Sequence, residues 1–283
     1  SISVYPSIHV EQKHIDTIVE YTKRLSKALH IIGLVNIQFV LFNDQVYVIE
    51  VNPRSSRTVP YISKVTGITM VDLATRCMLG EKLSDMGYGI GLYPPADFYA
   101  VKVPVFSFQK LHNVDTQLGP EMKSTGEVLG VAKDYHEALF KGLLAAGYPI
   151  KRGGNVLLSV RDGDKPELIA IADRLAWLGF ELYATAGTAS TLNRSMIATN
   201  VVRKIDEPAP NIETLLESGK IDYLVSTNNH HGPLDAGVRV RRRAVELGIP
   251  CLTAIDTAAA LTEILSIDLT VEKVELVDIN KLR

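Results

Sequence analysis

The spacing of apolar residues differs between two parts of the chain and predicts a different set of elements in each. Between residues 11 and 32, apolar positions recur every three or four residues, which indicates an amphipathic helix. Two runs rich in β-branched and aromatic residues, Val35–Phe42 and Val46–Val51, follow and predict a hairpin. The rest of this part is predicted to form helices over Met70–Leu79 and Asp134–Ala146 and a strand over Phe98–Val105.

After Gly147 and Pro149, short apolar runs alternate with helical patterns. The predicted strands are Asn155–Val160, Glu181–Ala184, Val201–Lys204, Tyr223–Ser226 and Cys251–Leu252. The predicted helices between and after them are Pro166–Leu178, Thr188–Leu192, Ile212–Glu217, Asp235–Leu247 and Thr257–Leu265. Such alternation with short connections favours an α/β fold with a parallel sheet covered on both faces. We therefore predict two domains, residues 1–148 and 149–283.

Composition and charge narrow the class of protein. The 283 residues fit two domains, and 46% hydrophobic with 22% charged residues is typical of a soluble protein with a core. A net charge of -2 disfavours a general nucleic-acid binder, and no apolar run is long enough to predict a membrane span. No signal peptide is visible, and Cys77 and Cys251 lack metal-binding spacing, so we expect a cytoplasmic protein. The chain begins at Ser1 rather than Met, which is consistent with a piece of a longer protein.

Polar oxygen ligands gather on the predicted hairpin. A three-residue loop, Asn43–Gln45, would place Gln38 opposite Glu50, with Asn52 on the same face. A two-residue loop would instead place Gln38 opposite Ile49, so the geometry depends on the register. With the first register, one carboxylate and two amide oxygens converge, and such ligands suit Mg²⁺ that also binds a nucleotide's phosphates.

Two arginines follow the hairpin directly. Arg54 and Arg57 could together bind an anionic substrate. The alternative is a polar strand end followed by solvated arginines, and residue types alone leave both interpretations open.

A second group of polar residues follows the predicted strands of the second domain. Thr185-Ala186-Gly187-Thr188 comes after one strand and opens a helix, where free N–H groups can bind phosphate. Simple N-capping by Thr188 is the alternative. Because ligands bind at the carboxyl ends of parallel strands, other groups near strand ends could converge there. These groups are Lys151, Lys204, Ser226, Thr227 and Asn228.

The hairpin motif carries a family resemblance. Gln38 and the string Glu50–Lys64 resemble the ATP-grasp of the carbamoyl phosphate synthetase large subunit, and Gly119–Val128 continues the match. The resemblance implies two Mg²⁺ or Mn²⁺ ions at the ATP site, with Glu50 bridging both and Gln38 and Asn52 each holding one. It also implies that Arg54 and Arg57 contact the bicarbonate-derived or phosphoryl intermediate.

Residues 149–267 resemble the methylglyoxal-synthase-like domain that ends the same large subunit. The resemblance implies a Rossmann-like regulatory domain that binds an allosteric nucleotide such as UMP or IMP. The matching positions are Lys151, Thr185, Gly187, Thr188, Lys204, Ser226, Thr227 and Asn228. Ser226 departs from the Asn often found there, which leaves the effector open. Thr253 matches an ornithine contact, but Val103 replaces an expected acidic residue, so ornithine activation is not expected.

The implied function is that of an ATP-dependent carbon–nitrogen ligase. In this family the whole enzyme phosphorylates bicarbonate, adds ammonia and phosphorylates the resulting carbamate with a second ATP. The nitrogen source, a glutaminase small subunit or free ammonia, stays open, as does the pathway, pyrimidine or arginine biosynthesis.

The resemblance covers only part of such an enzyme. Residues 1–148 contain no Gly-rich phosphate loop, so we expect the C-terminal end of a large subunit, with half of its second ATP-grasp, inactive by itself. One alternative is a stand-alone regulatory nucleotide-binding module. Another is a methylglyoxal synthase, which is disfavoured because residues 232–237 contain one Asp where His and Asp are expected together.

Overall fold

The computed structural model describes residues 2–108, 121–227 and 235–278. They form two compact units, which are treated separately. The N-terminal unit comprises the described residues of 2–102, 131–138 and 275–283, and the C-terminal unit those of 103–130 and 139–274. The domain boundary near residue 148 stays a prediction. No helix in the described part of the chain is both long and apolar enough to span a bilayer.

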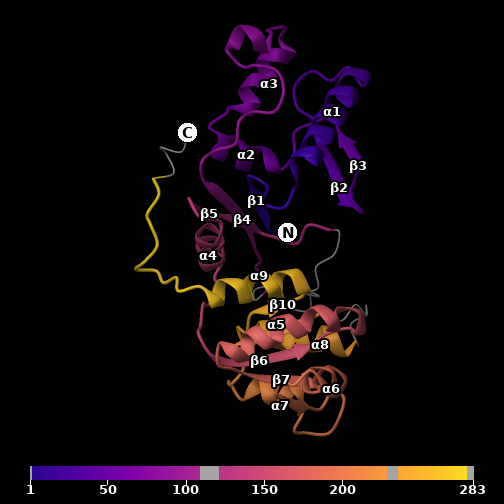
Figure 1. Ribbon diagram of the computed structural model, residues 1–283, viewed down its shortest axis with the longest axis vertical. Helices are drawn as coiled ribbons and strands as arrows, with labels where there is room; N and C mark the ends of the chain where they lie inside the picture. Colours follow the sequence, from indigo (N-terminus) through magenta and orange to yellow (C-terminus); the bar gives the residue numbers. More distant parts are fainter. Residues whose placement is uncertain (1, 109–120, 228–234, 279–283) are drawn as a thin grey trace. The chain divides into compact units, whose positions relative to one another are not determined.

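The N-terminal unit is built around a two-stranded hairpin and a small sheet. Its elements are β1 (Ser3–Tyr5), α1 (Gln12–Ala28), β2 (Asn36–Phe42), β3 (Gln45–Asn52), α2 (Thr58–Thr66), α3 (Met70–Met78) and the 3₁₀ helix η1 (Leu83–Met86). Three further elements, β4 (Tyr99–Val105), β5 (Gly126–Ala132) and α4 (Tyr135–Ala145), contain residues of both units. Helix α1 packs along the β2–β3 hairpin (Figure 1). A second sheet has the order β1-β4-β5.

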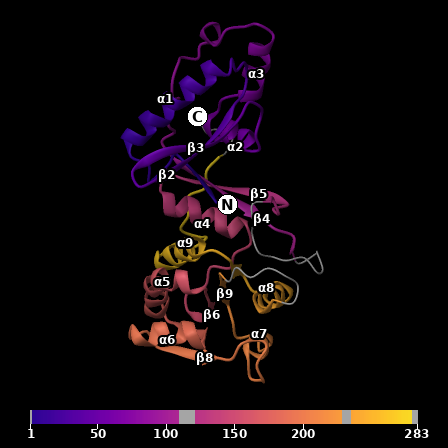
Figure 2. The same cartoon turned by 90° about the vertical axis from the view of Figure 1, so that its right-hand side faces the viewer.

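The C-terminal unit contains the predicted α/β fold. Its elements are β6 (Gly154–Ser159), η3 (Asp162–Asp164), α5 (Lys165–Trp177), β7 (Phe180–Thr185), α6 (Ala186–Arg194), β8 (Thr199–Val202), α7 (Ile212–Glu217), β9 (Tyr223–Ser226), α8 (Ala236–Glu246), β10 (Cys251–Leu252) and α9 (Ile255–Ser266). The strands form one parallel sheet in the order β10-β9-β6-β7-β8. Helices α5, α6 and α9 cover one face, and α7 and α8 cover the other (Figure 2).

The strand order creates a switch point at the first strand of the sheet. From β6 the chain moves outward through β7 to β8 and then returns to β9 on the other side of β6. Connections therefore leave β6 and β9 toward opposite faces, which opens a crevice beyond the carboxyl ends of these two strands. Ser159 and Ser226 are paired at this point. In open parallel sheets, this crevice is the usual place for a ligand.

Apolar side chains fix the sheet between its two helical layers. Leu157 in β6 and Leu224 in β9 are fully buried. On the face of α7 and α8 they pack with a cluster of aliphatic residues: Ile205, Ile212, Leu216, Ile221, Val240, Ala244 and Ile249. A close-packed core of this kind has few voids and holds the strand ends in place.

Candidate functional site

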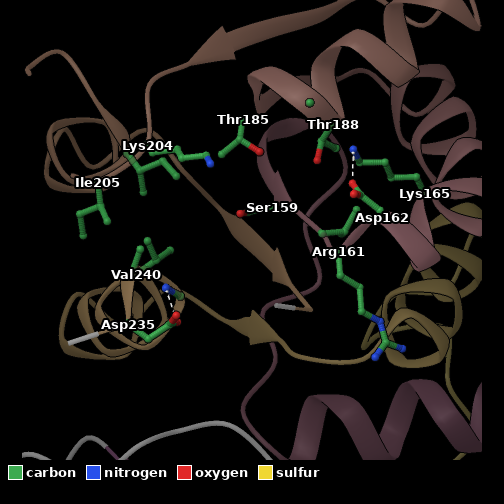
Figure 3. Close-up of a pocket in the computed structure, with 15 residues that line it drawn as sticks. Ser159, Arg161, Asp162, Lys165, Thr185, Thr188, Lys204, Ile205, Asp235 and Val240 are labelled. Atoms are coloured by element: carbon green, nitrogen blue, oxygen red, sulfur yellow. Dashed lines mark hydrogen bonds and ion pairs between the residues drawn. The ribbon is translucent and has the colours of Figure 1, made fainter. Parts of the chain in front are cut away.

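A cavity of about 540 Å³ lies at the carboxyl ends of the parallel strands. Ser159 and Thr185 are the last residues of β6 and β7, and Lys204 follows β8 by two residues. The first turns of α5, α6 and α8 complete the wall (Figure 3). Of the residues predicted for the anion pocket, Thr185, Gly187, Thr188 and Lys204 line this cavity together.

Helix α6 presents unused backbone donors to the cavity. Its N-cap, Thr185, is extended and makes no side-chain capping bond. Neighbouring helices differ, because Asn211 caps α7 and the Asp235 carboxylate caps α8. The first N–H groups of a helix have no partner inside the helix, so those of Gly187 and Thr188 are available to an anion. The capping role considered for Thr188 is wrong, since Thr185 occupies the N-cap.

Lys165 contributes a cation that the sequence analysis missed. A Cβ added to Gly187 would lie 3.2 Å from the Lys165 ammonium, so this ammonium lies directly over the start of α6. The same nitrogen forms an ion pair of 2.7 Å with Asp162. The sequence could have indicated Lys165, because it stands at the start of the helix that follows the first strand of the parallel sheet.

Lys204 supplies a second cation from another element. Its backbone N–H donates to Glu207, but among the described residues its ammonium has no hydrogen bond or ion pair. Figure 3 shows the ammonium directed toward Thr185. An anion over α6 would therefore meet positive charge from Lys165 and Lys204 in addition to the helix N-terminus.

The end of β9 contributes less to the cavity than the sequence predicted. Ser226 and Thr227 are buried, at 1% and 4% exposure, and neither lines the cavity. The Thr227 hydroxyl accepts a hydrogen bond from the Arg161 backbone, whereas Ser226 Oγ is buried without a partner among the described residues. Asn228 lies outside the described residues, so the structure does not place it.

Lys151 is not brought to the cavity. It precedes β6, and its ammonium forms a 2.6 Å ion pair with Asp222, the residue just before β9. Both residues therefore lie at the amino ends of the strands, opposite the cavity. The sequence prediction grouped Lys151 with residues at the carboxyl ends, and the parallel topology separates them.

Asp222 anchors this amino-terminal edge and predicts a pH effect. Partial burial raises the pKa of its carboxyl, but hydrogen bonds from Lys151 and the Asn155 N–H outweigh this and hold the pKa below its usual range. A depressed carboxyl pKa stabilises the fold above the unfolded pKa, and this contribution is lost as pH falls through the folded pKa. We expect Asp222→Asn to cost about 1–2 kcal/mol at neutral pH and little below the folded pKa. Urea unfolding from pH 3 to pH 7 measures this; an equal cost at every pH would contradict it.

Thr253 lies in a separate cavity. This cavity of about 320 Å³ is also lined by Phe106, Phe108 and Tyr148. Val103 is 1% exposed and does not line it. Cys251 borders the same cavity, and burial raises the pKa of its thiol to about 12, so the thiol is protonated at neutral pH.

The β2–β3 hairpin has the predicted pairing but a different loop. The loop is two residues, Asn43 and Asp44, both with positive φ, so the chain adopts the shorter of the two loops considered. A bulge at Ile49 shifts the register, and Gln38 still pairs with Glu50. The pairing expected from a longer loop is thus reached through an extra residue within the strand.

The oxygen ligands share one face of this hairpin. The Asn52 amide nitrogen donates to Glu50 Oε1 at 2.8 Å, which leaves the Asn52 amide oxygen and Glu50 Oε2 as acceptors. Among the described residues, no three His, Cys, Asp or Glu side chains cluster to hold a metal. One carboxylate and two amides fit a hard divalent cation only when further oxygens come from a ligand such as a phosphate.

The two arginines follow the hairpin on exposed positions. The Arg54 guanidinium donates to the Ser55 carbonyl at 2.9 Å, and Arg57 immediately precedes α2. Within the described residues, neither guanidinium forms a hydrogen bond or ion pair with Gln38, Glu50 or Asn52. The two arginines therefore lie close to the ligand set in the sequence, and their role stays a prediction.

Comparison with known proteins gives matches for both units. A family model described as "Carbamoyl-phosphate synthase L chain, ATP binding domain" matches residues 1–86, and one described as "MGS-like domain" matches residues 167–253. Two solved structures are similar in part. A biotin carboxylase domain of a single-chain bacterial carboxylase has 22% identity and a TM-score of 0.34, covering 37% of this chain and 25% of that one. A methylglyoxal synthase from Elizabethkingia anophelis has 17% identity and a TM-score of 0.31, covering 42% and 81%.

Two relatives match almost the whole chain. The carbamoyl phosphate synthase large chain of Lachnoclostridium phytofermentans is 50% identical over 92% of this chain, and that of Agathobacter rectalis is 48% identical over 94%. The chain spans 25% of the length of each relative. With both units matched in this way, the chain belongs to the carbamoyl phosphate synthase large-chain family.

Proposed function

We propose that the C-terminal unit binds a nucleoside monophosphate, such as UMP or IMP, as a regulatory ligand. The observation that carries this is the cradle at the switch point, where the uncapped start of α6 lies between the ammonium groups of Lys165 and Lys204. The phosphate would accept N–H bonds from Gly187 and Thr188. Lys165 lies at one end of the cavity, and Val240 and Ile205 lie at the other (Figure 3). The apolar end suits the nucleoside.

We further propose that the N-terminal unit contributes half of an ATP site that phosphorylates carbamate. Glu50, Gln38 and Asn52 would hold two Mg²⁺ or Mn²⁺ ions, which when bound neutralise charge on the nucleotide's phosphates. Glu50 supplies the only carboxylate of this set and therefore most of its attraction for cations. Arg54 and Arg57 would bind and orient the anionic substrate through paired N–H donors.

The activity of the whole enzyme is proposed from the family to which the chain belongs. Its substrates would be ATP, bicarbonate and ammonia, with a glutaminase small subunit as partner if glutamine is the nitrogen source. We place the protein in the cytoplasm and the regulatory domain at residues 149–283. A chain that carries only this part of the ATP site would bind nucleotide without producing carbamoyl phosphate.

Nucleotide binding is tested by the melting temperature of the purified chain with UMP and IMP. A ligand that binds only the folded state at about 100 times its dissociation constant adds roughly 2.7 kcal/mol of stability. We expect the transition of the C-terminal unit to rise by about 5–10 °C. Uridine without phosphate is the matched control and should give a far smaller shift. No shift with UMP, IMP or another nucleoside monophosphate at millimolar concentration would refute the proposal.

A further inference from the structure

An acidic side chain stands beside the phosphate cradle. Asp162 belongs to the short turn η3 between β6 and α5, and its carboxylate is 95% exposed. It forms a 2.7 Å ion pair with Lys165, whose side chain is only 19% exposed (Figure 3). The same ammonium lies over Gly187, so Asp162 lies one ion pair away from the anion position.

The other charged residues that line the cavity do not neutralise the negative charge of Asp162. Arg161 points away from the cavity (Figure 3), and its Nε donates to Asp164 at 2.8 Å. The Asp235 carboxylate accepts from Gly237 and Val238 N–H and so is held by the start of α8. The charge that faces the cradle is therefore that of Lys165 and Lys204, reduced by Asp162.

We propose that Asp162 is a charge-selectivity residue, which reduces the advantage that anions of charge −3 or more would otherwise have over a dianionic phosphate monoester in the cradle. This inference rests on the proposed nucleotide site and goes beyond it, because it assigns a residue that sets which phosphate chain is accepted. Repulsion between the carboxylate and the ligand grows in proportion to the ligand's charge. A nucleoside diphosphate therefore loses more affinity to Asp162 than a monophosphate does.

The carboxylate keeps its charge at the pH where the site would work. The hydrogen bond from Lys165 lowers the pKa of Asp162. The group is ionised at neutral pH in the absence of ligand, when it acts as an internal anion for Lys165. Because Asp162 is exposed, salt must screen its effect, which gives the proposal a second observable.

The test compares UMP with UDP, and phosphate with pyrophosphate, by titration calorimetry at pH 8 and low salt. The proteins are the full chain, Asp162→Asn, and Asp173→Asn, which removes an exposed carboxylate of the following helix, α5, outside the cavity. We expect Asp162→Asn to reduce the preference for UMP over UDP by about threefold or more. This change should shrink at about 0.5 M salt, where the Debye length is only a few ångströms. Phosphate and pyrophosphate should follow the same order, and Asp173→Asn should keep the preference of the unchanged chain.

The outcomes distinguish failure of the selectivity role from failure of the nucleotide site. An unchanged UMP-to-UDP preference in Asp162→Asn overturns the selectivity role while leaving the nucleotide site intact. An equal change in Asp173→Asn also overturns it, because the effect would then be one of net charge. An unchanged chain that binds neither UMP nor phosphate refutes the site and the selectivity together.

Discussion

Replacing Glu50 with Gln is expected to abolish carbamate phosphorylation in a full-length large chain that contains this sequence. Glu50 pairs with Gln38 across the hairpin and accepts a hydrogen bond from the Asn52 amide. Gln keeps the size of the side chain but removes the only negative charge of the ligand set, so both proposed metal ions should bind weakly. We expect a rate loss on the order of 10³-fold or more. The measurement is ATP synthesis from ADP and carbamoyl phosphate across a Mg²⁺ titration.

Two comparisons make this result specific to the hairpin. Gln38→Ala should raise the Mg²⁺ requirement and leave more activity, because the bridging charge remains. Glu20→Gln, an exposed carboxylate on α1, should behave like the unchanged enzyme. Near-normal rates in Glu50→Gln, with the circular dichroism spectrum unchanged, would remove the metal assignment.

Lys204→Ala is expected to remove at least half of the melting shift given by UMP. The Lys204 ammonium has no partner among the described residues and faces the cavity, so its charge is available to the phosphate. Loss of one charge-assisted hydrogen bond weakens affinity by about 10- to 100-fold. Adding Lys165→Ala should abolish the shift, since both ammonium groups of the cradle are then gone. Thr188→Ala should remove less, because the backbone N–H groups remain.

The control for these variants is Lys220→Ala, an exposed lysine at the opposite end of the strands. It should keep the full UMP shift. A full shift in Lys204→Ala would reject the role given to that lysine and retain the cavity. A full shift in the double variant would show that nucleotide binds elsewhere.

The C-terminal unit could be predicted well because its pattern is strong. Ile212–Glu217, Tyr223–Ser226 and Cys251–Leu252 have the predicted bounds, and the alternation of strands and helices produced the expected parallel sheet. The N-terminal unit was harder. Helix α2 was missed because Thr58–Thr66 contains β-branched residues and a proline, and β5 because glycines interrupt it.

The site residues show where sequence order stops being informative. Lys151 and Lys165 flank the same strand, yet only Lys165 reaches the cavity, because it follows the carboxyl end of β6. The bulge at Ile49 left no glycine or proline as a signal, so a two-residue loop was expected to pair Gln38 with Ile49, whereas the structure pairs Gln38 with Glu50. Both errors concern register and strand direction, which depend on partners distant in sequence.

The phosphate cradle is tested most directly by mapping amide chemical shifts of the full chain during a UMP titration. We predict that the amide signals of Gly187 and Thr188 move most, because these N–H groups would bind the phosphate. Glu50 and its hairpin neighbours should not move at concentrations that saturate the cradle. Saturable shifts centred away from the start of α6, for example around Thr253, would contradict the assignment of this cavity as the nucleotide site.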